Sequence, residues 1–160
     1  MNLPDDLNEL ARAIIDANRY MTLGTTEPDT RPRLSPVYFT HADHRTFYWV
    51  SSPTARHSRN IEVRPEVALA IYDSTAEIGD GRCVYIDATA SIVPDEELPQ
   101  RCAEAFANVA PGATAFQPEQ LTGDARLRLY LAHATSHEVH VPGRDPSNES
   151  GIDTRRQVTP

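Results

Sequence analysis

The alternation of apolar and polar residues predicts a chain made mainly of strands. Turn-forming residues at 28–32, 41–45 and 79–81 separate short runs with strand-like patterning. Because short turns join neighbouring antiparallel strands, the pattern predicts six strands in antiparallel hairpins. These runs are 20–26, 34–40, 46–50, 67–72, 82–93 and 126–135, the last resuming after a break at 138–141.

Helical periodicity interrupts the strands three times. Residues 4–18 and 94–109 carry apolar side chains at helical spacing behind acidic first turns, and Pro53 opens a third helix that ends near Val63. Hairpins with inserted helices favour a small β-barrel with flanking helices, in the mainly β (α+β) class. At 160 residues the chain is expected to form one domain over residues 1–160, with a loop-rich tail from residue 142 until a short patterned stretch at 155–158.

Charge narrows the classes of partner. The net charge is −8 and the pI is near 5.1, so the molecule would repel nucleic acid and anionic membrane surfaces. All 15 basic residues are arginine, which excludes mechanisms that need a lysine Schiff base. The N-terminus lacks the features of a signal peptide and no stretch is apolar enough to span a membrane, so a cytoplasmic location is expected.

One strand-to-helix junction carries candidate binding chemistry. Ser51 and Ser52 follow an aromatic strand, Ser52 is expected to cap the helix that Pro53 begins, and Arg56 and His57 come within its first turns. Hydroxyls, free backbone amides and guanidinium groups together suit a phosphate-bearing ligand. A surface helix that is merely rich in arginine fits the spacing equally well.

The same segments resemble the pyridoxamine 5'-phosphate oxidase-like family of flavin-binding split β-barrels. The resemblance rests on the serine-rich turn, its cationic residues and a following Pro-x-Val-Ala-Leu, and it covers most of residues 10–93. It implies a six-stranded antiparallel split β-barrel with flanking helices that forms a homodimer with FMN at the interface. The matching segments are 21–26, 33–39, 47–61, 64–69 and 84–90.

The resemblance also implies where the cofactor sits. In the family the second strand lines the isoalloxazine ring, and the turn and helix after the third strand hold the phosphate. Trp49 or Tyr48, on opposite faces of their strand, could cover the flavin. The hydride chemistry then belongs to the cofactor, so no catalytic side chain is named. The implied ring-binding residues are Arg33, Leu34, Ser35, Pro36, Val37 and Trp49, and the implied phosphate-binding residues are Ser51, Ser52, Arg56 and His57.

The expected function is therefore an FMN-dependent oxidoreductase that acts on a small organic substrate. Two departures from the family pattern bear on it. Many members have a lysine where His57 stands, and a neutral imidazole is a weaker phosphate partner. The arginine-rich, tryptophan-containing C-terminal strand of the vitamin-oxidising members is missing, with Arg155 and Arg156 as the nearest equivalent. The alternatives are a deazaflavin-dependent reductase and a non-catalytic flavin- or haem-binding protein.

Histidines and cysteines offer no further site by pattern. His133, His137 and His140 alternate at the period of a strand, so no metal site is expected from them. His41 and His44 lie in a polar hairpin loop and are expected to be solvated. Cys83 and Cys102 are expected to be buried structural thiols.

Overall fold

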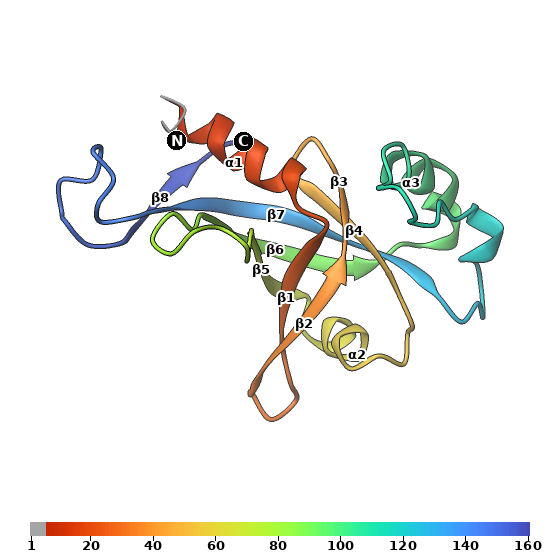
Figure 1. The fold of residues 1–160 in the computed structure, drawn as a ribbon. Coiled ribbons are helices and arrows are strands. Elements are labelled where there is room, and N and C mark those ends of the chain that lie inside the picture. Colours follow the sequence, from red (N-terminus) through yellow and green to blue (C-terminus); the bar gives the residue numbers. More distant parts are fainter. Residues whose placement is uncertain (1–5) are drawn as a thin grey trace.

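The chain folds into a strongly curved sheet flanked by helices (Figure 1). The computed structural model describes residues 6–160. None of the helices there has the length and apolar character needed to cross a membrane. The helices are α1 (Leu7–Ala17), α2 (Arg56–Val63) and α3 (Leu98–Ala105), with 3-10 turns at Asp95–Glu97 and Pro118–Gln120. The strands are β1 (Tyr20–Thr26), β2 (Pro32–Tyr38), β3 (Thr40–Ala42), β4 (Thr46–Ser51), β5 (Glu66–Tyr72), β6 (Cys83–Ile92), β7 (Arg128–Val141) and β8 (Thr154–Val158).

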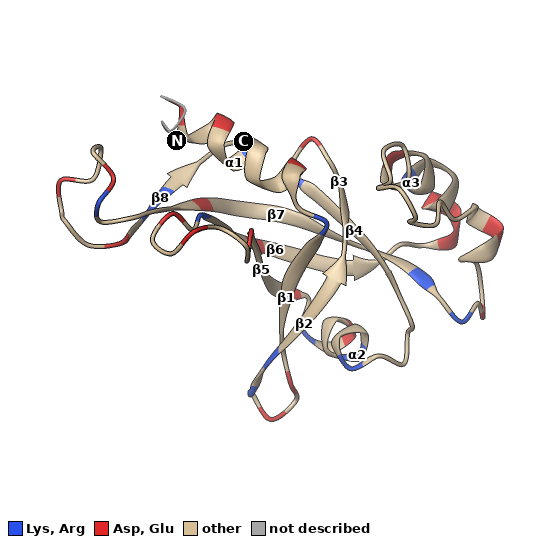
Figure 2. Ribbon diagram, viewed as in Figure 1, with Lys and Arg blue, Asp and Glu red and all other residues tan. Residues whose placement is uncertain are grey.

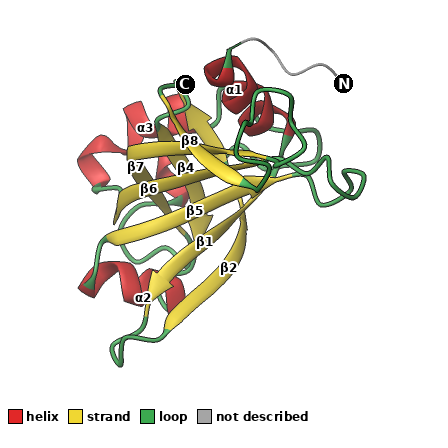
Figure 3. Ribbon diagram, turned by 90° about the vertical axis from the view of Figure 1, so that its left-hand side faces the viewer, coloured by secondary structure: helices red, strands yellow, loops and turns green. Residues whose placement is uncertain are grey.

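All the described strands belong to one antiparallel sheet. Its order is β2-β1-β5-β6-β7-β4-β3, and β8 pairs with β7. The sheet curls so that β2 and β4 approach each other, with α1 at one end and α2 at the other (Figures 1 and 3). Such a curled, half-closed antiparallel sheet fits the predicted split barrel, and the mainly β class is confirmed.

Two short strands, β3 and β8, are not among the six predicted strands, so the predicted count of six is wrong. β3 occupies part of the predicted 41–45 loop, and β8 forms at the short patterned stretch 155–158 of the tail, which was not predicted as a strand. Each is held by pairing with a longer strand: β3 with β4, and β8 with β7. Tertiary pairing therefore supplies what local periodicity does not show. The predicted break in the last long strand is a bulge at Thr135 within an uninterrupted β7.

Two hydrophobic clusters fill the two sides of the sheet. The larger lies within the curve of the sheet, where Met21, Leu23 and Phe47 are buried and α1 contributes Ala11 and Ile15. The smaller lies beneath α3. Trp49 belongs to the first cluster and Tyr48 to the second, which confirms that they occupy opposite faces of β4. Residues of the smaller cluster include Leu98, Cys102, Ala105, Leu121 and Leu129.

The helix starts differ from those predicted. Asp6 caps α1 through a hydrogen bond from the Asn8 backbone N–H, while Pro4 and Asp5 lie outside the described residues. α2 begins at Arg56 rather than at Pro53, because the Ser52 hydroxyl accepts the Thr54 backbone N–H and holds a turn instead. The predicted Ser52 cap is therefore wrong.

The third helix is shorter than predicted, and both cysteines have free thiols. α3 ends at Ala105, short of the predicted residue 109, and Leu98, Cys102 and Ala105 are its buried residues. Cys102 is buried as expected and Cys83 is half-buried, and both are free thiols.

Candidate functional site

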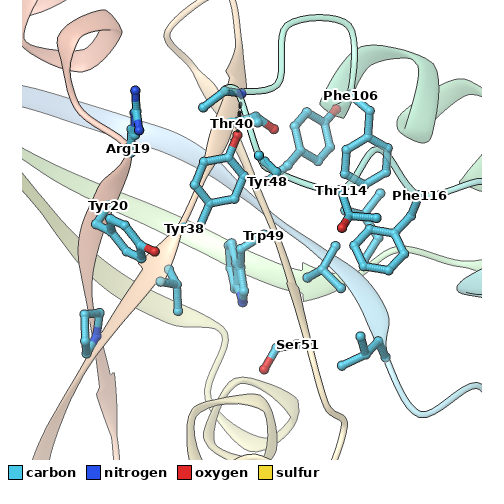
Figure 4. A pocket seen from close by; sticks show the side chains of 18 of the residues that line it. Arg19, Tyr20, Tyr38, Thr40, Tyr48, Trp49, Ser51, Phe106, Thr114 and Phe116 are labelled. Carbon is cyan, nitrogen blue, oxygen red and sulfur yellow. Dashed lines mark hydrogen bonds between the residues drawn. The ribbon is translucent and has the colours of Figure 1, made fainter.

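A cavity of about 650 Å³ lies between strands β2 and β4 and the segment that follows α3. This volume is in the range of small-molecule and cofactor sites. Figure 4 shows Trp49 at its centre, with Tyr20 and Tyr38 on one side and Phe106 and Phe116 on the other. The remaining lining residues are Arg19, Pro36, Val37, Thr40, Tyr48, Val50, Ser51, His57, Ala110, Pro111, Gly112, Ala113, Thr114, Leu127 and Leu129.

Aromatic side chains fix the walls of this cavity. The Trp49 ring stacks on Tyr130, with 5.8 Å between centroids and 17° between planes. On the opposite wall Phe106 packs against Phe116 at 5.9 Å. The Tyr38 hydroxyl accepts the Ala110 backbone N–H at 3.0 Å and so ties the segment after α3 to β2 (Figure 4). The cavity is thus preformed, and aromatic side chains form much of its wall.

Two polar atoms on the cavity wall lack partners. The Trp49 indole Nε1 and the Thr40 hydroxyl are buried, and neither makes a hydrogen bond within residues 6–160. An unsatisfied buried donor costs about 1–3 kcal/mol, so native proteins usually pair such groups with a ligand or water. Tyr48 differs, because its hydroxyl donates to Glu104 at 2.6 Å and burial raises the pKa of Tyr48 to about 12. The Trp49 indole N–H and the Thr40 hydroxyl are therefore the two buried groups of this wall that have no partner within residues 6–160.

The lower end of the cavity is polar. Ser51, the last residue of β4, lies with its hydroxyl 2.8 Å from His57 Nε2 on the first turn of α2. Burial lowers the pKa of His57, which keeps the imidazole neutral near pH 7. This end therefore offers neutral hydrogen-bonding groups beside the backbone amides of a short helix.

Arginines flank the polar end, and a carboxylate already holds them. Glu27, directly after β1, accepts from Arg33 Nε at 2.7 Å and from Arg56 at 3.2 Å. The hydrogen bond from Arg33 leads the interactions that hold the pKa of Glu27 below its usual range. Figure 2 shows these charges gathered where the β1–β2 hairpin meets α2. Arg56 remains 64% exposed, so its free guanidinium nitrogens can reach a ligand.

The structure divides the predicted site residues into two groups. Pro36, Val37, Trp49, Ser51 and His57 line the cavity. The predicted residues outside its lining are Arg33, Leu34, Ser35, Ser52 and Arg56.

Each residue of the second group has an observable place. Leu34 points to the outer face of the sheet and is 69% exposed. Ser35 lies half-buried in β2 and pairs with Leu23 of β1. The Ser52 hydroxyl belongs to the turn before α2, and Arg33 and Arg56 converge on Glu27.

Several cavity residues were missed by the sequence reasoning. Tyr38 lies within the predicted strand 34–40 directly after Val37, and it could have been found by extending the list of ring-binding residues by one position. Phe106 and Phe116 could not, because their approach to β4 depends on the path of the chain after α3. Glu27 carried only the signal of a charged residue at a strand end.

The histidines follow the sequence prediction only in part. His133 bonds to Thr46, and His137 bonds to the His44 backbone carbonyl, so these two do not converge. His41 and His44 are half-buried and both contact Asp16, so the prediction that they are solvated is wrong.

Comparison with known proteins agrees with this architecture. A curated pyridoxine/pyridoxamine 5'-phosphate oxidase from Rubrobacter xylanophilus is 33% identical over 101 residues, covering 59% of this chain and 45% of that protein. The chain thus matches less than half of that relative's length. A heme binding protein from Mycobacterium smegmatis has a TM-score of 0.69 and 18% identity, covering 98% of this chain and 60% of that one.

Another solved structure has the same fold at a similarly low sequence identity. A FAD-binding protein from Mesorhizobium loti has a TM-score of 0.62 and 16% identity, covering 82% of this chain and 90% of that one. At this identity the likeness concerns the fold alone. The sequence model of the family described as Pyridoxamine 5'-phosphate oxidase matches residues 7–136, which is most of the chain. The chain therefore belongs to the pyridoxamine 5'-phosphate oxidase family.

Proposed function

We propose that this protein binds FMN in the cavity beside Trp49 and acts as a flavin-dependent oxidoreductase on a small organic substrate. The observation that carries the proposal is the buried, unpaired Trp49 N–H at the aromatic wall of a cavity of about 650 Å³. A planar ring system with hydrogen-bond acceptors would fill the apolar space and satisfy that donor. Residues 1–160 would form one FMN-binding domain.

The polar end would receive the FMN phosphate. Ser51 and His57 lie at the cavity, Ser52 is in the adjoining turn, and Arg56 has exposed guanidinium nitrogens. Charge-assisted contacts from Arg56 would be the strongest of these. The neutral state of His57 would leave Arg56 as the main cationic partner.

A second copy of the chain would complete the site. The outer face of the sheet exposes Tyr20, Leu34 and Tyr72, which are large apolar side chains that water disfavours. On the same face Gly24 carries no side chain, and a Cβ there would lie only 3.2 Å from the Ala68 carbonyl oxygen. Because no side chain projects at this position, this part of the surface stays flat. Leu34→Glu should therefore yield a monomer in analytical ultracentrifugation and should lower FMN retention.

The division of labour follows from the residues present. A bound flavin would supply the electron or hydride transfer itself. The chain would hold the ring against Trp49, exclude water with Phe106 and Phe116, and orient the ring through the indole N–H. No side chain of the cavity is assigned an acid–base role.

Absorbance spectroscopy of the purified protein, before and after addition of FMN and dialysis, tests the proposal. Oxidised flavin bands retained at one per chain, and turnover with a reduced nicotinamide, are expected. Arg56→Ala should weaken FMN binding by about 1.5–3 kcal/mol while leaving riboflavin binding unchanged, since riboflavin has no phosphate. A protein that retains no FMN would contradict the proposal.

The same spectrum separates the alternatives. A Soret band after addition of haem, without flavin retention, would identify a non-catalytic haem-binding protein. Retention of a deazaflavin coenzyme in preference to FMN would identify a deazaflavin-dependent reductase. The net charge of −8 disfavours the second alternative, because an anionic polyglutamate tail needs a basic groove.

A further inference from the structure

A side-chain cluster away from the flavin cavity joins α1 to the β3–β4 hairpin. The Asp16 carboxylate oxygen Oδ1 lies 2.9 Å from His41 Nε2 and 2.8 Å from His44 Nε2. All three atoms lie within 4.8 Å of one another. Two imidazoles and one carboxylate form a ligand set that divalent transition metals, zinc among them, bind well.

The ligand spacing allows a single ion to reach all three atoms. Two tetrahedral ligands about 2.1 Å from a zinc ion are about 3.4 Å apart, so an ion would enter after the Asp16 oxygen moves about half an ångström away from the two imidazole nitrogens. The Asp16 side chain is 56% exposed, whereas those of His41 and His44 are 21% and 18% exposed. The cluster therefore has two held imidazoles and an open side where water can complete the coordination.

The hairpin turn directs His44 toward this point at a cost. Asp43 and His44 have φ values of 54° and 55°, in the left-handed region where glycine is favoured. A histidine in that conformation stores strain, which persists where the surrounding structure holds it. The His137 Nε2–H donates to the His44 backbone carbonyl at 2.9 Å, so the turn is also anchored from β7.

The two histidines are not equivalent ligands. The His41 Nδ1 accepts the His44 backbone N–H at 3.3 Å, so its ring carries the proton on Nε2 when no ion is bound. Coordination through Nε2 would move that proton to Nδ1 and break this long hydrogen bond. Within residues 6–160 no hydrogen bond engages His44 Nδ1, so His44 can take the metal-binding tautomer freely. His44 is therefore the stronger ligand of the pair.

We propose that Asp16, His41 and His44 bind one divalent transition-metal ion of the zinc class, which staples the end of α1 to the β3–β4 hairpin. His44 and Asp16 supply the main ligands, and His41 completes the set. The site opens on a second cavity of about 470 Å³ that Asp16 and His41 line together with Arg19 and Tyr38. Arg19 and Tyr38 also line the flavin cavity, so an ion here would fix one of its corners. The proposal does not depend on flavin binding.

Isothermal titration of EDTA-treated, full-length protein with Zn²⁺ tests the proposal. One ion per chain is expected, together with a rise in thermal midpoint, because an ion that binds only the folded state stabilises it. His44→Gln should lower Zn²⁺ affinity by about 100-fold or more. Mutation of residues that only hydrogen-bond to a metal ligand already lowers affinity by about 10–100-fold, and His44 is a direct ligand. His41→Gln should lower it less.

Two further variants make the test decisive. His133→Gln is the matched control, because His133 bonds to Thr46 and stays outside the cluster, so its Zn²⁺ affinity should equal that of the wild type. Asp16→Asn removes the carboxylate but keeps the shape of an exposed side chain. Its Zn²⁺ affinity therefore tests the proposal if His44→Gln does not fold. Absence of saturable Zn²⁺ binding, or equal affinity of wild type and Asp16→Asn, would overturn the proposal.

Discussion

The two ends of the candidate flavin cavity are built in opposite ways. The ring end is made of buried aromatic residues whose positions are set by packing, with Trp49 stacked on Tyr130. The polar end, where we propose that the phosphate binds and which we call the phosphate end, has polar groups at a turn. It is flanked by arginines that are partly exposed and paired with Glu27. The first end is part of the core, and the second is held by ion pairs whose arginines are partly exposed.

Because the two ends differ in this way, substitutions in them should have different effects on the stability of the fold and on the affinity for flavin. A change at the ring end should alter both the fold and the binding of any flavin, since the same contacts serve both. A change at the phosphate end should alter the binding of FMN but not of riboflavin. Substitutions at each end therefore test whether stability and flavin affinity depend on different residues.

The largest effect is expected at Trp49. Trp49→Ala should lower the free energy of unfolding by about 3–5 kcal/mol, because it leaves a cavity in the larger cluster. Trp49→Phe should preserve most of the packing and weaken flavin binding by about 1 kcal/mol through loss of the indole N–H. Urea denaturation and FMN titration measure the two quantities. Equal stability of both variants would show that this wall is not part of the core.

At the phosphate end, Glu27→Gln should move stability and affinity in opposite directions. The variant loses the carboxylate that pairs Arg33 and Arg56, so its thermal midpoint should fall. Its FMN affinity should rise because both guanidinium groups become available to phosphate, whereas riboflavin affinity should not change. Parallel titrations with the two flavins check this. A rise for both flavins would mean that Glu27 acts on the ring end.

His57→Lys should have a smaller effect on the same end. A lysine places a permanent positive charge where burial keeps the imidazole neutral. FMN affinity should increase by about 1 kcal/mol, roughly fivefold in Kd. The gain should shrink at high salt, which screens a partly exposed pair. Fluorescence titrations at two salt concentrations measure it, and a gain that ignores salt would argue against a phosphate contact.

The smallest expected effect is the pH dependence caused by His57. Because burial lowers its pKa in the folded state, the unfolded chain binds a proton first as the pH falls below about 6.5. Stability without flavin should therefore decline from pH 7.5 towards pH 5.5. His57→Gln should make that decline shallower, without abolishing it, since other buried histidines contribute. Thermal midpoints across this range provide the measurement, and identical slopes would exclude His57 as a source.

Local patterns predicted the elements whose burial repeats along the chain. Residues 20–26 alternate cleanly, and β1 has these bounds. The start of α2 was misplaced because Ser52 can cap a helix or close a turn, and local sequence does not distinguish the two outcomes. β8 and the pairing of Asp16 with His44 join residues distant in sequence, which no short pattern can reveal.

The candidate site shows the same limit. The spacing after β4 singled out Ser51 and His57, which line the cavity, whereas Phe116 reaches the cavity only because the chain after α3 folds back over β4. Glu27 meets Arg56 across the sheet, 29 residues away. Some cavity-lining residues of the local motif could be singled out from the sequence, and those brought in by topology could not.

Strand β7 has a consequence for how the protein is made. It pairs with β4, β6 and β8, and its residue His133 contacts Thr46, 87 residues earlier in the chain. During synthesis the amino-terminal strands must wait for β7 to leave the ribosome before β4 gains this partner. A nascent chain that ends before β7 therefore lacks Leu129 of the cavity wall. The cavity can thus form only after β7 has been synthesised.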